Sequence, residues 1–250
     1  MTATFGCKLY NTADFLLNQV NGILIQGINE DISSKINSVN IPRRHGGKID
    51  DTQFLNPRII SIEGLIIGTS KENYRDNIAT FLKNIKFGKQ KFYKFDDRYI
   101  WVNNGSLQVR DISTLMAGNF SLDLICVDPF WYNLTESNND FTTASTSYGF
   151  SVTTLGNVIT PARISIMAAT NFTNPTITNS TLLQTATYTG VSTALIEDTA
   201  NLTVTSGGSN VLSNFSGEFI NLGVGLNNLI FTQSASVSVT IRVYWTNRYY

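Results

Sequence analysis

Apolar and polar residues alternate over short stretches through most of this chain, which is the spacing of β-strands that bury one face. The run 58–67, RIISIEGLII, is rich in the β-branched residues that strands favour. Later runs of this kind are separated by two pairs with turn chemistry, Asp96-Asp97 and Asn104-Gly105, and Asn-Gly is a strong signal of a hairpin turn. The segment 236–245 alternates most clearly, with apolar residues at every second position: Val237, Val239, Ile241, Val243 and Trp245. The pattern predicts a mainly β protein.

One segment has helical spacing instead. Its apolar residues recur three and four positions apart, at Tyr74, Ile78, Phe81, Leu82 and Ile85. Residues 69–72 offer an N-cap followed by an acidic first turn, and Gly88 is a natural stop. We therefore expect one amphipathic helix over residues 70–87, laid against the sheet of the first half.

The stretch 28–56 is looser than its surroundings. It carries charges, Pro42 and a Gly46-Gly47 pair but few aromatic residues. Long structureless loops are uncommon inside compact domains. We expect an extended hairpin arm over 28–56 that reaches away from the core and finds its stabilising contacts on another subunit.

Charged residues divide the chain of 250 residues into two regions. Residues 1–140 hold 15 of the 18 basic and 15 of the 18 acidic residues, so few charges remain in 141–250. In that second region Ser, Thr and Asn make up 45 of 110 residues, set among short apolar runs. We predict a first domain over 1–138 and an antiparallel β-sandwich over 139–250. Disorder is the competing interpretation, but Val, Ile, Leu and Phe recurring at strand spacing argue against it.

The overall charge limits the classes of function. The chain has no net charge and only 14% charged residues, against about 25% in typical domains. It therefore lacks the electrostatic footprint of a protein that grips nucleic acid or an anionic membrane. No stretch approaches the roughly 20 apolar residues of a membrane span, and the N-terminus lacks a secretory signal pattern. We expect a soluble protein made in the cytoplasm, without a membrane partner, whose Cys7 and Cys126 are buried thiols.

Residues able to carry chemistry are few. His45 is the only histidine, which excludes multi-histidine metal sites, and its polar turn favours a solvated loop residue. Glu63 and Asp128 stand out among the carboxylates, but an edge charge and a turn cap explain them better than paired acid and base catalysis. The Gly-Val-Gly segment 223–225 lacks the third glycine of a phosphate loop and is interpreted as a turn. We expect no enzymatic activity, no metal and no cofactor.

Two small basic clusters are candidates for subunit contacts. Arg43, Arg44 and Lys48 form the first, and aspartates follow it at positions 50 and 51. The second cluster consists of Lys83, Lys86, Lys89, Lys91 and Lys94. Basic clusters of this kind attract the phosphate groups of nucleic acids, so contact with nucleic acid is an alternative. The neighbouring aspartates favour inter-subunit salt bridges or a solvated helix face.

The second region also has the composition of a sugar-binding surface. Aromatic faces stack on sugar rings, while amides and hydroxyls bond the hydroxyl groups of the sugar. The candidate aromatic residues are Tyr148, Tyr188, Tyr244, Tyr249 and Tyr250. Core packing and subunit contact explain these scattered tyrosines equally well.

Several motifs, taken in order, resemble one known family. The first are a Pro-Arg-Arg-His-Gly-Gly turn at 42–47, the run RIISIEGLIIG at 58–68, the helix, and the segments 91–97 and 99–102. A strand from Phe120 then leads into the closing signature, Asp128, Pro129, Phe130, Trp131 and Tyr132. This order resembles the N-terminal domain of phage distal tail proteins, the siphovirus-type tail component family. Three later segments resemble the C-terminal sandwich of the same family, at 156–157, 161–164 and 219–227.

The resemblance implies an N-terminal β-sandwich related to tail-tube proteins, with one helix, and a C-terminal sandwich like those of galectins or carbohydrate-binding modules. It implies a homo-hexameric ring in the virion, at the distal end of a long non-contractile tail. The ring would join the tail tube protein to the tail-tip and receptor-binding proteins, and DNA would pass its lumen without specific binding, in keeping with zero net charge. The alternative is a protein that binds host polysaccharide directly through its C-terminal sandwich.

Overall fold

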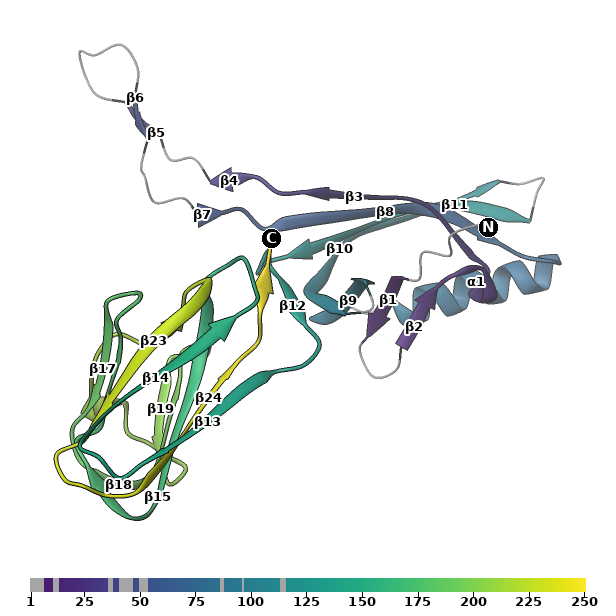
Figure 1. Ribbon diagram of the computed structural model, residues 1–250. Coiled ribbons are helices and arrows are strands. Elements are labelled where there is room, and N and C mark those ends of the chain that lie inside the picture. Colours follow the sequence, from purple (N-terminus) through teal and green to yellow (C-terminus); the bar gives the residue numbers. More distant parts are fainter. Residues whose placement is uncertain are drawn as a thin grey trace. The chain divides into compact units, whose positions relative to one another are not determined.

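The computed structural model describes residues 7–10, 14–35, 38–40, 47–49, 54–85, 88–95, 97–112 and 116–250 (Figure 1). The chain forms two compact units, Met1–Trp131 and Tyr132–Tyr250, which are the N-terminal unit and the C-terminal unit below. Antiparallel strands dominate both units, which confirms the mainly β prediction. The predicted domain boundary between 138 and 139 falls inside β13 (Ser137–Thr143), a strand of the C-terminal unit.

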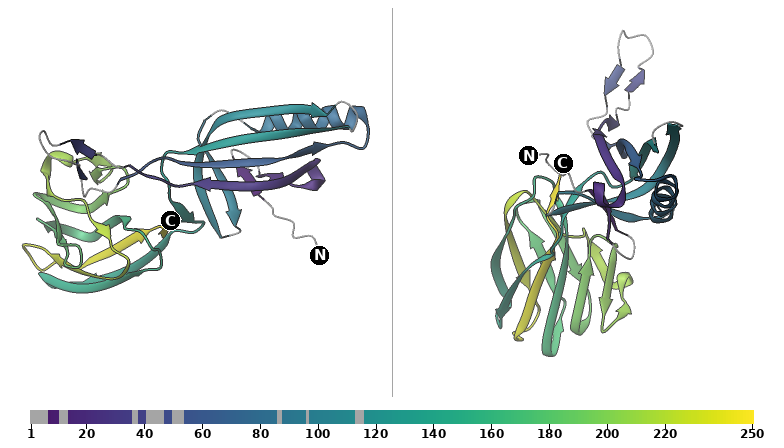
Figure 2. Two further views of the ribbon diagram at one scale, coloured as in Figure 1. Left: turned by 90° about the horizontal axis from the view of Figure 1, so that it is seen from above. Right: turned by 90° about the vertical axis from the view of Figure 1, so that its right-hand side faces the viewer.

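The N-terminal unit is built on one antiparallel sheet (Figures 1 and 2). Its main strands stand in the order β2 (Asp14–Leu17), β1 (Cys7–Tyr10), β9 (Gln90–Phe95), β10 (Arg98–Ile112), β11 (Ala117–Cys126), β8 (Arg58–Ile67) and β3 (Ile23–Asp31). The long strand β10 pairs first with β9 and then, through its remaining residues, with β11. A short 3-10 turn, η1 (Gln19–Asn21), leads into the edge strand β3.

The hairpin turn predicted at Asn104 and Gly105 is wrong. Both residues lie inside β10, where the register against β11 shifts between Asn104 and Ser106. A bulge suits a glycine here, because a Cβ on Gly105 would lie only 3.0 Å from Ile125 Cδ1. The turn predicted at Asp96-Asp97 is confirmed at Asp97, which stands between the paired strands β9 and β10.

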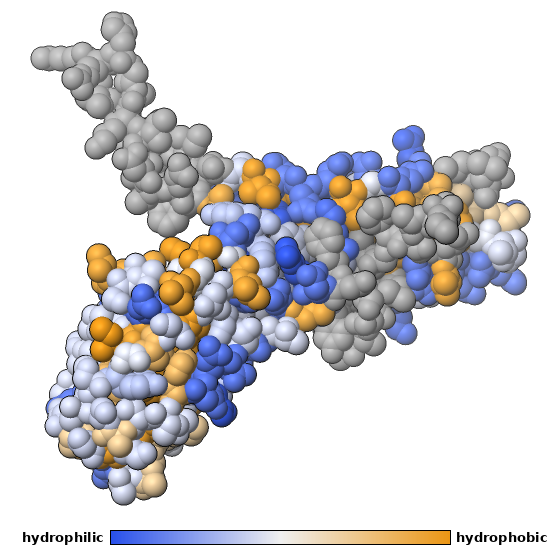
Figure 3. Space-filling view, viewed as in Figure 1, coloured by the Kyte–Doolittle hydropathy of each residue, from blue (hydrophilic) through white to orange (hydrophobic). Residues whose placement is uncertain are grey.

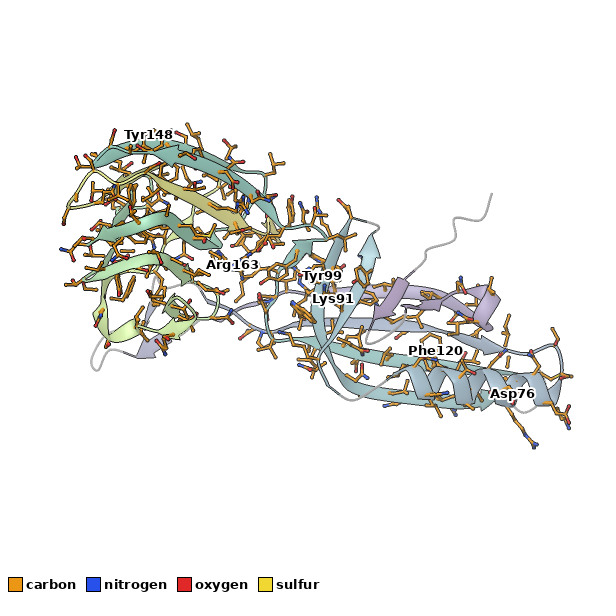
Figure 4. The ribbon with its side chains drawn as sticks, turned by 90° about the horizontal axis from the view of Figure 1, so that it is seen from below. Asp76, Lys91, Tyr99, Phe120, Tyr148 and Arg163 are labelled. Carbon is orange, nitrogen blue, oxygen red and sulfur yellow. The ribbon has the colours of Figure 1, made fainter. Side chains whose placement is uncertain are left out.

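One face of this sheet carries the core of the N-terminal unit. Alternate residues of β8 and β11 are fully buried there, namely Ile60, Ile62, Ile66, Leu122 and Leu124. Helix α1 (Lys71–Asn84) lies along β8 and places the Phe81 ring 4.8 Å from the ring of Phe120 (Figures 2 and 4). The buried face of the sheet, formed by every second strand residue, thus packs against the apolar side of the helix.

The start of α1 confirms the predicted N-cap. Ser70 is extended, and its Oγ accepts a hydrogen bond from the Asn73 N–H at 3.1 Å. The helix ends earlier than the predicted limit at 87. The spacing predicted Leu82 on the apolar side of the helix, but this side chain is 47% exposed. The buried side of the helix is centred on Phe81, which is fully buried.

The segment 28–56 continues from the sheet as a series of short strand pairs. β3 and β8 stay paired as far as Asp31 and Ile59. Beyond them β4 (Ser34–Lys35) pairs with β7 (Phe54–Leu55), and β5 (Ser38–Asn40) pairs with β6 (Gly47–Ile49) (Figure 1). The described part of this arm therefore has the form of a hairpin. Its contact with another subunit stays a prediction.

The C-terminal unit consists of two antiparallel sheets. The first has the order β13, β24 (Val239–Trp245), β15 (Thr160–Thr173), β18 (Val191–Asp198), β19 (Thr203–Ser206) and β20 (Ser209–Asn210), with β22 (Asn221–Leu222) beside β15. The second has the order β14 (Ser147–Thr154), β23 (Gly225–Thr232), β16 (Thr176–Asn179), β17 (Gln184–Tyr188) and β21 (Phe215–Gly217). The remaining elements are β12 (Trp131–Asn133), β25 (Arg248–Tyr249) and η2 (Leu212–Asn214).

Apolar residues from both sheets pack into one core. Its members include Phe150, Ile164, Phe231, Ile241 and Val243. The alternation predicted for 236–245 is confirmed over β24, whose odd-numbered residues are buried and whose even-numbered residues are half-buried. Figure 3 shows pale, weakly polar side chains over much of this unit, as its Ser, Thr and Asn content leads one to expect. The likeness of this sandwich to galectins stays a prediction.

Candidate functional site

The signature residue Trp131 closes the core of the N-terminal unit. It is 3% exposed, and its ring centroid lies 6.2 Å from that of Phe92 on β9. The guanidinium of Arg58 stands 5.8 Å from the same ring. Burial of so large a side chain contributes to stability, and it leaves little of the indole for a ligand.

The other signature residues are placed around this anchor. Asp128 lies half-buried in a bend, Pro129 is buried and Phe130 is half-buried. Tyr132 begins the C-terminal unit, where the guanidinium of Arg248 lies 5.5 Å from its ring. The motif therefore contributes packing at the end of the N-terminal unit. The turn-cap role of Asp128 stays a prediction.

A partly buried ion-pair network lies beside Trp131. Glu30 on β3 accepts hydrogen bonds from Arg58 Nη1 at 2.8 Å and from Lys94 Nζ at 2.5 Å. Arg58 is 1% exposed, and its Nε and Nη2 have no hydrogen-bond partner among the described residues. Removing Glu30 would leave a buried charge without compensation, so this pair matters for stability. Its one signal in the sequence is an arginine at the start of an otherwise apolar run.

The thiol of Cys126 lies in the same part of the core. It is fully buried, as predicted. Burial raises the pKa of this thiol to about 12, although nearby Arg58 lowers it. A thiol held neutral in this way is a poor nucleophile. The side chain of Cys7 lies outside the described part of the chain.

The opposite face of the sheet, formed by β3, β8, β11 and β10, presents carboxylates and hydroxyls together with the exposed residues Ile59, Ile125 and Arg110. Ser61 Oγ and Ser106 Oγ each donate to the Asp123 carboxylate, both at 2.7 Å. These bonds, first that of Ser61, lower the pKa of Asp123. Glu63 is exposed on the same face as Ser61. Its interpretation as an edge charge is wrong, because β8 lies between β11 and β3.

Lysines and aromatic rings alternate on β9 and β10. Lys91 Nζ lies 4.1 Å from the centre of the Tyr99 ring, and the two are neighbours in Figure 4. Lys89 Nζ lies 4.4 Å from the Trp101 ring, and Tyr99 and Trp101 meet edge to face at 5.6 Å. The second predicted lysine cluster is therefore divided. Lys83 stands on α1, Lys94 binds Glu30, and Lys86 falls outside the described residues.

The turn interpretation of residues 223–225 is confirmed. Asn227, which is fully buried, accepts a hydrogen bond from the Gly223 N–H at 2.7 Å. Its Nδ2 donates to the Gly223 and Gly225 carbonyls at 2.9 and 3.0 Å. Gly225 has φ +82°, a value that favours glycine. The segment is braced from inside as a turn between β22 and β23.

The predicted subunit-contact residues are only partly placed. Arg43, Arg44 and His45 lie outside the described residues, and Lys48 belongs to β6. Their roles stay predictions. Within the described ranges, no group of three or more His, Cys, Asp or Glu side chains is arranged to hold a metal ion. Of the helices in that part of the chain, none is long and apolar enough to cross a membrane.

Residues 10–126, which make up most of the N-terminal unit, match the family model described as the phage tail protein RIFT-related domain. The chain carries a phage tail protein domain. The resemblance to phage tail proteins inferred from the sequence is thereby confirmed, and with it the place of the protein in the tail of a virion. The family is one of structural tail proteins.

Solved structures extend the likeness to the whole fold. The SPP1 Dit (gp 19.1) protein, described as a paradigm of the hub adsorption apparatus in phages that infect Gram-positive hosts, aligns with a TM-score of 0.75. That alignment covers 98% of this chain and 99% of the other at 16% identity, so the two proteins share a fold over both units. A chain of the native gene transfer agent virion aligns with 50% of this chain and 92% of its own length, at 10% identity and a TM-score of 0.31. No curated protein matches the sequence.

Proposed function

We propose that this protein forms the ring-shaped hub at the distal end of a siphophage tail and joins the tail tube to the host-adsorption apparatus. The observation that carries the proposal is the shared fold with SPP1 Dit over nearly the full length of both chains. The phage tail domain at residues 10–126 supports it independently. The hub has no enzymatic task, and its partners are the tail tube protein and the tail-tip and receptor-binding proteins.

The ring is a homo-hexamer formed by the N-terminal unit. Its sheet has two edge strands, β2 and β3, and edges of this kind pair readily with another chain. A head-to-tail contact that repeats around an axis closes into a ring. The hairpin arm that continues β3 and β8 supplies a second contact, through Arg43, Arg44 and Lys48.

On this face of β3, β8, β11 and β10 the carboxylates outnumber the exposed Arg110, which suits the wall of a DNA passage. It presents the carboxylates of Glu63 and Asp123 together with the hydroxyls of Ser61 and Ser106. The carboxylates repel phosphate, and both hydroxyls already donate to Asp123, so this face is suited to let DNA pass without retaining it. The Ser/Thr/Asn-rich C-terminal unit then provides the docking surface for the adsorption proteins.

Native mass spectrometry of the full chain, alone and with tail tube protein, tests the ring. We expect hexamers, and we expect the double variant Arg43→Glu with Arg44→Glu to weaken them, because reversed charges would repel the acidic groups of the neighbouring subunit. The matched control reverses Lys71 and Arg75, which are exposed on α1. A protein that stays monomeric with the tube protein present contradicts the hub, whereas an unchanged hexamer in the arm variant contradicts only the arm contact.

A further inference from the structure

The outer face of the first sheet of the C-terminal unit carries one polar row across its strands. In the antiparallel register, Asn138 on β13 stands opposite Tyr244 on β24, and Tyr244 stands opposite Arg163 on β15. Arg163 in turn stands opposite Asp198 on β18, which faces Thr203 on β19. Residues far apart in the sequence are thereby brought into a single line.

A pocket of about 190 Å³ is lined by the middle three residues of this row, Tyr244, Arg163 and Asp198. Its polar lining includes Glu136, Arg163, Asp198, Asn201, Tyr244 and Thr246. All of these residues belong to the C-terminal unit, so the pocket does not depend on how the two units are arranged. Its size is that of a small polar molecule and not of an extended chain.

Arg163 is held in place at one side of the pocket. Its Nη2 donates to Glu136 Oε2 at 2.8 Å, and its guanidinium lies 3.9 Å from the centre of the Tyr244 ring. The Tyr244 hydroxyl accepts a hydrogen bond from Arg242 Nη1 at 3.3 Å, and Arg242 also forms a two-pronged ion pair with Asp140. The donors of Arg163 are therefore presented in a preorganised orientation.

Asp198, the cross-strand neighbour of Arg163, is also held in place. Asn201 Nδ2 donates to Asp198 Oδ2 at 2.8 Å, and the Asn201 backbone N–H donates to Asp198 Oδ1 at 3.2 Å. A carboxylate oxygen accepts more than one hydrogen bond, and the Asn201 amide oxygen is a further acceptor. The lining thus presents the acceptors of Asp198 and Asn201 beside the donors of Arg163.

The charge of the lining selects the class of ligand. Arg163 carries one positive charge, whereas Glu136 and Asp198 carry two negative charges, so the charged side chains of the lining itself sum to minus one. Phosphates, nucleic acid and acidic sugars are disfavoured by that balance. A neutral polyol fits it, because each hydroxyl both donates and accepts and so bonds an arginine and a carboxylate at once.

We propose that this pocket binds one residue of a neutral saccharide. The observation that carries the proposal is the convergence of Arg163, Asp198, Asn201 and Tyr244 around a hollow on the outer sheet face. The binding site is additional to the ring-forming role of the N-terminal unit. It gives the C-terminal unit a direct contact with polysaccharide at the end of the tail.

The other tyrosines proposed from the sequence do not belong to this site. Tyr188 is buried in the sandwich core, and Tyr148 packs beside Phe150 with 6.1 Å between ring centroids. Figure 4 shows Tyr148 well away from Arg163. Tyr249 and Tyr250 also lie outside the pocket lining. Of the five candidates, Tyr244 is the one that lines the hollow.

Ligand-observed NMR with the full-length protein tests this site. The probes are methyl glycosides of glucose, galactose, N-acetylglucosamine and N-acetylgalactosamine, with glucuronic acid as the anionic comparison. We expect at least one neutral glycoside to bind with a dissociation constant on the order of 1 mM, as for other ligands of this size, and glucuronic acid to bind more weakly. Absence of binding by every neutral glycoside, or tighter binding of glucuronic acid, overturns the proposal.

Two substitutions in the pocket lining locate the binding. Arg163→Met and Asn201→Ala should each weaken the bound glycoside by about tenfold, because each removes hydrogen-bonding groups from the lining. The matched control is Arg110→Met, which removes an exposed arginine of the N-terminal unit. Undiminished binding in both pocket variants overturns the assignment. Hexamer formation is measured on the same samples and should not change, so loss of sugar binding is separable from failure of the hub.

Discussion

Glu197 is a buried acidic residue in the core of the C-terminal unit, and its titration should control the stability of that unit. It is 7% exposed and lines a cavity of about 10 Å³ beside Ile164 and Leu195. Its Oε1 accepts a hydrogen bond from the Ile220 N–H at 2.7 Å. Burial raises the pKa of Glu197 from 4.5 to about 7, an effect larger than the lowering by that hydrogen bond.

The direction of the pH dependence follows from this raised pKa. The folded unit holds the Glu197 proton more tightly than the unfolded chain does, so stability is fully present below about pH 4.5 and is lost as pH rises through about 7. At about 1.4 kcal/mol for each pH unit between the two pKa values, the loss amounts to about 3 kcal/mol. Glu197→Gln should abolish most of it, because a neutral amide oxygen can still accept from Ile220.

The assay is urea unfolding between about pH 5 and pH 8. Because the two units can unfold separately, unfolding of the C-terminal unit is followed by hydrogen exchange in peptides that contain β18. The wild type should lose stability over that range while Glu197→Gln stays nearly constant, with Glu218→Gln as an exposed control that behaves like the wild type. The reasoning is refuted if the wild-type unit is equally stable at both ends of the range, or if Glu197→Gln retains the wild-type slope.

Two further predictions concern the N-terminal unit. Phe81→Ala should cost about 3–5 kcal/mol in the free energy of unfolding, because it removes the ring that packs between α1 and the sheet. Leu82→Ala, at the exposed neighbouring position, should cost far less. Equal losses of the two variants in urea titrations would contradict this packing. Glu30→Gln should lower the free energy of unfolding by about 3 kcal/mol, because it leaves Arg58 buried without its counter-charge. Glu63→Gln, on the exposed face of β8, should leave the unfolding midpoint nearly unchanged. If Glu30→Gln leaves the midpoint unchanged as well, the ion pair does not stabilise the unit.

Local features of the fold were accessible from the sequence. The N-cap at Ser70, the alternation in β24 and the turn at 223–225 each depend on residues a few positions apart. The same reasoning failed at Asn104 and Gly105, where a turn signal lies inside a continuous strand. Pairing with β11 on one side overrides the local preference there, because the bulge keeps the rest of β10 in register.

The candidate sites were less accessible. Composition indicated a sugar-binding surface but distributed it over five tyrosines, and no spacing distinguished Tyr244 from the buried Tyr188. Asp198 and Arg163 carried no signal at all, since they meet only through the pairing of β15 with β18. Glu63 drew attention as a lone charge in an apolar run, yet its position in mid-sheet depends on β3 covering the other edge of β8.

The sequence alone therefore establishes a mainly β chain, its one helix, the unequal charge of its two regions and its likeness to phage tail proteins. These properties reside in periodicity, composition and short motifs, which neighbouring residues determine. Tertiary structure decides that Arg58 is buried against Glu30, that Trp131 closes a core and that Tyr244 lines a pocket. Burial and strand register arise from contacts between distant segments, such as Lys94 with Glu30 across 64 positions, and no local pattern encodes them.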